Sequence, residues 1–163
     1  MTEIGEGAFE GCTSLTSVTI PDSVMAIGDS AFMNCTGLTN IVIPDSVTKI
    51  GWHAFSDCGL KSIIIPKSVK KIEVDAFFDC SSLKDLTILC PIVIDDILSY
   101  CTALETLTLG TGIKKINADN FEGVNLKAIN VPAKKADYYK QRLPEELHGL
   151  IVELPADKKA KKK

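Results

Sequence analysis

The chain has 163 residues, of which 45% are hydrophobic and 24% are charged. These proportions are typical of a folded domain with a real core, and they exclude a chain that is disordered throughout. The formal net charge of −3 does not favour nucleic-acid binding. No apolar run approaches the roughly 18 residues of a membrane span. The first residues lack the features of a secretory signal, which predicts a cytoplasmic chain. If it is a fragment of an exported parent, a cell-surface or secreted location is expected instead.

A repeat of 21 to 23 residues organises most of the chain. Its most regular position holds a large apolar residue in six successive copies: Phe9, Phe32, Phe55, Phe77, Leu98 and Phe121. Five residues earlier the sequence predicts an aliphatic column made of Ile4, Ile27, Ile50, Ile72, Val93 and Ile116. Three residues later come Cys12, Cys35, Cys58, Cys80 and Cys101, with Val124 in the sixth copy. A fixed period of this length indicates stacked coils whose repeated side chains form continuous interior columns.

Each copy also contains one short segment rich in β-branched residues, and these segments are predicted to be strands. They cover 18–20, 41–43, 63–65, 86–88, 107–109 and 128–131. Four of them are followed directly by a proline, which lacks the N–H that would continue a sheet. The pattern therefore predicts about six coils, each with one strand in a parallel sheet and with short bends elsewhere.

At this point the sequence resembles a known family. The string Leu-x-x-Val-x-Ile-Pro-x-Ser-Val-x-x-Ile-Gly-x-x-Ala-Phe-x-x-Cys occurs at 15–35, and a close copy occurs at 38–58. It is similar to the repeat of BspA-like (Treponema pallidum-type) leucine-rich repeat proteins. The resemblance implies a right-handed, curved solenoid with strands on its concave face and short loops or 3-10 turns on its convex face. It also implies surface adhesion or ligand binding, with no catalytic centre and no cofactor.

The solenoid is expected to span 1–132. The copy around Cys90 is two residues short, which predicts a local irregularity there. Residues 133–155 are expected to form a C-terminal cap with a helix over 133–143 and a last apolar strand. The segment 156–163 carries five lysines and is predicted to be a disordered tail. Without residues 158–163, which hold these lysines, 13 basic and 21 acidic residues leave a body of net charge −8.

Neither the cysteines nor the histidines predict an enzyme. Five cysteines share one repeat position and no Cys-x-x-Cys pair exists, so we expect buried thiols rather than a metal site. Cys90 lies off this register and is the one to test for reactivity. His53 aligns with Asp75 one coil later, which predicts a surface pair rather than part of a catalytic triad.

Two surfaces are candidates for partner binding. The first is the outward face of the strands, where Val42 and Ile64 form an apolar spot; its predicted residues are Thr19, Val42, Ile64, Thr87 and Thr108. The second surrounds Trp52, which stands where earlier copies have acidic residues, with Val74 and Phe78 nearby. The alternative for Trp52 is that it folds back over its own coil.

The sequence therefore predicts a non-enzymatic binding module that recognises a protein or glycan partner. The alternative is a structural or self-assembling intracellular scaffold. In that case the uncovered strand of the N-terminal coil would mediate homodimerisation. The lysine tail would then only make the chain more soluble. No transmembrane segment and no nucleic-acid partner are expected.

Overall fold

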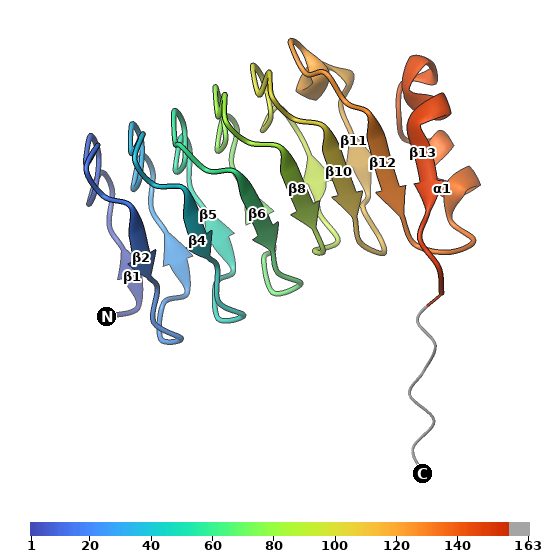
Figure 1. Cartoon of the computed structure of the whole chain (residues 1–163). Coiled ribbons are helices and arrows are strands. Elements are labelled where there is room, and N and C mark those ends of the chain that lie inside the picture. Colours follow the sequence, from blue (N-terminus) through green and yellow to red (C-terminus); the bar gives the residue numbers. More distant parts are fainter. Residues whose placement is uncertain (157–163) are drawn as a thin grey trace.

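The computed structural model describes residues 1–156, apart from the side chains at 118 and 119. The coils stack side by side along one axis, and the helical segments lie at the C-terminal end (Figure 1). The predicted leucine-rich repeat solenoid is therefore confirmed. The predicted tail falls almost entirely outside the described residues.

The longer strands form one face of the solenoid, at the place where the repeat predicts them. They are β2 (Ser17–Thr19), β4 (Asn40–Val42), β6 (Ser62–Ile65), β8 (Asp85–Ile88), β10 (Thr106–Leu109), β12 (Ala128–Val131) and β13 (Ile151–Glu153). Every pairing is parallel, and one five-stranded sheet is formed by β6, β8, β10, β12 and β13. The first two strands pair only with each other, so the face is interrupted between β4 and β6.

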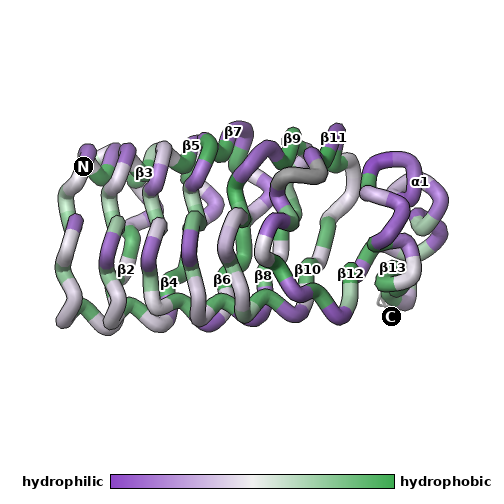
Figure 2. Tube along the Cα trace, turned by 90° about the horizontal axis from the view of Figure 1, so that it is seen from above, coloured by the Kyte–Doolittle hydropathy of each residue, from purple (hydrophilic) through white to green (hydrophobic). Residues whose placement is uncertain are grey.

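A second line of short strands runs along the opposite long side (Figure 2). Its members are two residues long: β1 (Glu3–Ile4), β3 (Ala26–Ile27), β5 (Lys49–Ile50), β7 (Lys71–Ile72), β9 (Val93–Ile94) and β11 (Lys115–Ile116). The sequence predicts only a bend in this part of each coil, so the second line is a correction to that expectation. Two residues are too few to show an alternating pattern, and stacking of neighbouring coils creates these pairings.

The shortened copy causes one error in the predicted columns. Ile94 pairs in register with Ile116 and is buried, whereas Val93 pairs with Lys115 and is 43% exposed. Val93 was therefore wrongly placed in the aliphatic column, because one residue is missing between this strand and Leu98. The second line of strands is also interrupted here, between β7 and β9. This interruption lies in the coil for which the sequence predicts an irregularity.

In several coils a proline stands just after the longer strand. In coils without that proline, the residue at the same position donates one more hydrogen bond to the preceding coil. Where proline is absent, Leu89 donates its N–H to the carbonyl of Ile65 at 3.0 Å, and Gly110 donates to Ile88 at 2.7 Å. A proline at this place removes that bond and ends the ladder at the preceding residue.

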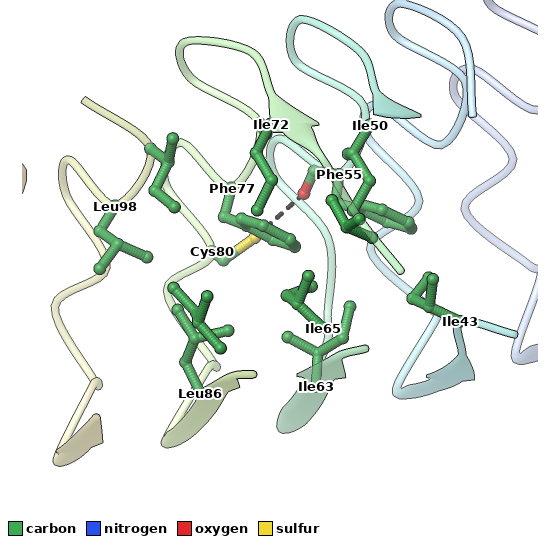
Figure 3. Close-up of a cluster of buried hydrophobic side chains, with 14 of the residues drawn as sticks. Ile43, Ile50, Phe55, Ile63, Ile65, Ile72, Phe77, Cys80, Leu86 and Leu98 are labelled. Atoms are coloured by element: carbon green, nitrogen blue, oxygen red, sulfur yellow. Dashed lines mark hydrogen bonds between the residues drawn. The ribbon is translucent and has the colours of Figure 1, made fainter. Parts of the chain in front are cut away.

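The core consists of the predicted columns (Figure 3). Neighbouring phenylalanine rings stack nearly parallel from Phe9 to Phe77, with centroids 5.1, 5.4 and 5.5 Å apart. Beside them, each buried cysteine of the column donates its S–H to a phenylalanine carbonyl of the preceding coil, as Cys80 does to Phe55 at 3.0 Å. Each of these carbonyls also accepts the backbone N–H of the cysteine in its own coil, as Phe55 does from Cys58 at 3.3 Å, so the thiol is a second donor that links two coils. Cys12 is exposed, unlike the rest of its column.

The C-terminal end is covered by three short elements. A 3-10 helix, η1 (Ala118–Phe121), precedes β12; the helix α1 (Ala136–Lys140) and a second 3-10 helix, η2 (Glu145–Leu150), lie between β12 and β13. The helix α1 is shorter than the predicted 133–143. Its Tyr139 is fully buried and donates its hydroxyl to the carbonyl of Gly110. None of the helices within residues 1–156 is long and apolar enough to cross a membrane.

Candidate functional site

The strand face presents the residues that the alternating pattern predicts. In each strand the flanking aliphatic side chains point into the core, and the residue between them points outward. Val42 is 72% exposed and Ile64 is 60% exposed, whereas Thr87 and Thr108 are partly exposed. Thr19 lies opposite Val42, and Thr87 lies opposite both Ile64 and Thr108, so the five predicted residues form one row along the face.

A groove of about 590 Å³ opens in this row where the sheet is interrupted between β4 and β6. Val42 and Ile64 line it from these two strands, which do not pair with each other, and Pro66 and Leu89 add to its apolar surface. A second groove of about 410 Å³ shares Leu89 and continues past Thr108 along the ends of the strands. The predicted apolar spot therefore lies in the wall of a concave surface, as small ligand-binding regions commonly do.

Polar residues make up part of the lining of the first groove, and Asn40 and Ser62 contribute from the strands themselves. Asp45 and Lys67 line it, one from each of the turns that follow the two strands. Ser68 also lines it, and its hydroxyl is buried with no hydrogen-bond partner among the described residues. The corresponding Ser46 donates to the carbonyl of Val24 at 2.6 Å. The regular serine contact between coils is thus missing at the groove.

The second predicted surface is built around a row of rings that crosses three coils. We call Trp52, His53, Phe78 and Tyr100 the aromatic row. Neighbouring ring centroids are 3.9, 6.1 and 5.4 Å apart, and all three contacts are edge to face. Trp52 is 50% exposed and packs against the ring of His53. The structure thus places Trp52 and Phe78 in one cluster. Val74 is exposed but has no place in the row.

Carboxylates flank the aromatic row. His53 Nε2 lies 3.9 Å from a carboxylate oxygen of Asp75, so the predicted surface pair is present. Burial raises the pKa of Asp75, and the nearby Asp96 adds to this effect, whereas His53 opposes it. The Tyr100 hydroxyl donates to Glu122 at 3.2 Å, which raises the pKa of this tyrosine.

The thiols are poorly suited to nucleophilic chemistry. Burial raises the pKa of Cys90 to about 11 and the pKa of Cys58 and Cys101 to about 12. A thiol with such a pKa is almost entirely protonated at neutral pH, and the protonated form is a weak nucleophile. Within residues 1–156, no group of three or more metal-ligating side chains is placed to hold an ion.

Sequence reasoning missed several contributors to both surfaces. Tyr100 extends the aromatic row, and its signal was a bulky ring at a position that holds Gly, Asn or Asp in the other copies. Leu89 and Lys67 each line both grooves. Both β4 and β6 keep the usual alternation; the sequence signal at the interruption is that Cys58 and Leu60, just before β6, are one residue closer than Cys35 and Leu38 in the preceding copy.

Comparison with protein families gives a match to the BspA-type leucine-rich repeat region, in six copies over residues 2–94 and 92–142. A comparison with curated proteins gave no match.

Several solved structures are similar. A leucine-rich cell surface protein of Faecalibacterium prausnitzii is 36% identical, with a TM-score of 0.65 over 70% of this chain and 31% of the other. The pneumococcal vaccine antigen PcpA is 26% identical, with a TM-score of 0.70 over 80% of this chain and 36% of the other. A Treponema pallidum leucine-rich repeat protein is 32% identical, with a TM-score of 0.62 over 90% of this chain and 73% of the other. The chain thus spans about a third of the length of the first two.

Proposed function

Since the chain belongs to the BspA-type leucine-rich repeat family, we propose that it is a non-enzymatic binding module that holds a protein partner on its strand face. The observation that carries this proposal is the groove at Val42 and Ile64, which combines an interrupted sheet with two exposed branched side chains. Solenoids commonly use such an extended strand face for recognition. That similar proteins are named as a cell surface protein and a vaccine antigen supports a partner outside the cell.

The lining of the groove favours a peptide segment with an apolar side chain over a glycan. Val42, Ile64 and Leu89 offer aliphatic surface, which releases water when another apolar group covers it. The strand-face residues Thr19, Val42, Ile64, Thr87 and Thr108 include no aromatic ring on which a sugar could stack. Asp45 and Lys67 at the groove can pair with polar groups of the same peptide.

A random peptide library displayed on phage tests this function against a glycan array screened in parallel. We expect recovery of peptides that share an apolar residue. The double variant Val42→Asp, Ile64→Asp should bind such a peptide at least about tenfold more weakly, because it replaces two apolar side chains of the groove with charged ones. Thr19→Asp is the matched control, since it adds a carboxylate to the same face outside the groove. Equal binding by the double variant, or enrichment of glycans alone, would contradict the proposal.

Self-association is the second candidate function, favoured by the free edge of β2. Among the described residues β2 pairs only with β4. Leu89 donates its N–H toward the preceding coil. Thr19 lies two residues before the position of its own coil that is equivalent to Leu89. Because every second N–H along a strand points to the same side, the N–H of Thr19 points at the unpaired edge of β2. An unpaired edge can template pairing with a second chain.

The variant Thr19→Pro tests this candidate, because it removes the outward N–H without removing a hydrogen bond to β4. Sedimentation velocity over a wide concentration range should show a dimer for the native chain and a monomer for the variant. A native chain that stays monomeric throughout would exclude this candidate. The result would leave the groove proposal unaffected.

A further inference from the structure

One member of the aromatic row, Tyr100, lies on backbone that disfavours a bulky side chain. Each of the first five coils has two positions of positive φ, two residues before and two residues after its repeat phenylalanine or Leu98, and the sixth coil has the second position. The second of these holds Gly11, Asn34, Asp57, Asp79, Tyr100 and Gly123. Tyr100 has a φ of 64°, a conformation that glycine, asparagine and aspartate adopt far more readily than a bulky residue.

His53 occupies the first position, where its φ is 50°, a conformation that histidine adopts more often than most other non-glycine residues. The other coils place Gly7, Ser30, Asp75 and Asp96 there. Two members of the aromatic row, His53 and Tyr100, therefore lie on backbone of positive φ. Strained residues of this kind concentrate at functional surfaces, because the surrounding structure can hold them in place.

The edge that carries the row is strongly acidic. We call the six corner segments 5–13, 28–36, 51–59, 73–81, 95–103 and 117–125 the acidic edge. Together they contain eleven aspartate and glutamate residues but no lysine or arginine. On the second line of strands, Lys49 and Lys71 both pair with Glu73 of this edge, at 3.8 and 2.7 Å. The edge as a whole therefore attracts cations.

We propose that the aromatic row and the acidic edge bind an extended, arginine- or lysine-rich segment of a protein partner. Cationic side chains gain energy over the faces of tryptophan and tyrosine rings. The exposed rings of Trp52 and Tyr100 provide such faces, and Asp75 and Glu122 lie beside the row. A neutral glycan could stack on the rings but would gain nothing from the carboxylates, so the charge favours the basic peptide.

This site is separate from the strand-face groove, so either proposal can fail without the other. Trp52, Phe78 and Tyr100 line neither groove. Variants of Val42 and Ile64 are therefore controls for the aromatic row, and variants of the row are controls for the groove.

Fluorescence anisotropy with a labelled peptide of alternating arginine and serine tests the proposal. The control peptide replaces arginine with glutamate. We expect binding of the arginine peptide that weakens as salt is raised. The variant Trp52→Ser, Tyr100→Asn should bind about tenfold more weakly, whereas Val42→Ser should bind as the native chain does. Equal affinity of the double variant, or binding of the glutamate peptide, would overturn the proposal.

Two further measurements sharpen the result. The single variant Tyr100→Asn should unfold at the same temperature as the native chain or higher, because asparagine tolerates positive φ. Its weaker peptide binding then cannot be attributed to loss of the fold.

A chain ending at residue 156 removes the lysine-rich end. If the arginine peptide binds only this shortened chain, the lysines of the protein itself occupy the site, and a foreign partner is excluded.

Discussion

The side-chain oxygen of Asn120 accepts a hydrogen bond from the backbone N–H of Ile97, one coil earlier, at 2.8 Å. In regular coils the equivalent alanine donates within its own turn, as Ala31 does to Gly28 at 3.3 Å. In the shortened coil the carbonyl three residues before Ile97, that of Ile94, instead accepts the N–H of Asn117 at 3.0 Å and the Asn120 side-chain nitrogen at 3.1 Å. One buried carboxamide thus supplies hydrogen bonds that the backbone of a full-length coil makes by itself.

Replacing Asn120 with alanine should lower the free energy of unfolding by about 2 to 3 kcal/mol. The variant leaves the buried N–H of Ile97 without its partner, whereas the carbonyl of Ile94 keeps the N–H of Asn117 at 3.0 Å; an unpartnered buried donor costs more than a lost hydrogen bond at the surface. Urea denaturation measures the change. Asn130→Ala is the control, since that side chain bonds only to the Thr108 hydroxyl on the strand face, and its loss should stay under about 1 kcal/mol. Equal losses would contradict the bridging role.

The cysteine column should contribute to stability without forming disulfides. We expect Cys80→Ala to lower the free energy of unfolding by about 1 to 2 kcal/mol, because it removes a buried sulfur and the hydrogen bond to Phe55. Cys12→Ala changes an exposed residue of the same column and should fall within about 0.5 kcal/mol of the native chain. Denaturation of both variants under reducing conditions makes the comparison. A neutral Cys80→Ala would show that the thiol column is dispensable.

Thiol labelling should distinguish the exposed cysteine from the buried ones. In the folded chain only Cys12 should react promptly with a disulfide reagent, because the other five are buried. The raised pKa of Cys90, about 11, also suppresses its thiolate form. Mass spectrometry after a short exposure identifies the labelled residue. Prompt labelling of Cys90 would contradict this assignment and reopen a chemical role for it.

Alkaline conditions should destabilise the fold. The pKa of Cys58 and Cys101 is raised from 9.0 to about 12, so these thiols stay protonated in the folded chain while the unfolded chain ionises. The unfolded state then binds fewer protons, and the free energy of unfolding falls as the pH rises. Stability should therefore be level near pH 8 and decline above pH 9. Urea titrations at several pH values measure this, and a flat profile up to pH 11 would disagree with it.

Gly59 should tolerate no side chain. A Cβ atom at this position would lie 2.1 Å from the carbonyl oxygen of Thr36 in the preceding coil. Because the obstacle is backbone, Gly59→Ala should lower the free energy of unfolding by about 1 to 3 kcal/mol. Gly149→Ala meets no atom within 4 Å and serves as the control. A normal thermal midpoint for Gly59→Ala would mean that the two coils can separate locally.

The sequence by itself determined the period, the inward columns and the strand face. Identical residues recurring once per coil must stack, so Phe32 and Phe55 could be placed against each other without coordinates. The same logic placed Val42 and Ile64 outward and adjacent, since side chains alternate along a strand. It misplaced Val93 because the copy was one residue short at that point.

Only the tertiary structure decided where the stack is interrupted and how rings from different coils meet. The groove depends on the failure of β4 and β6 to pair, which is a property of two coils together. The contact of His53 with Phe78 depends on backbone with positive φ, which a reading of side-chain types does not reveal. Repetition specifies what each coil shares with its neighbours. The two proposed binding surfaces arise where neighbouring coils differ, and those differences take effect only when the coils are stacked.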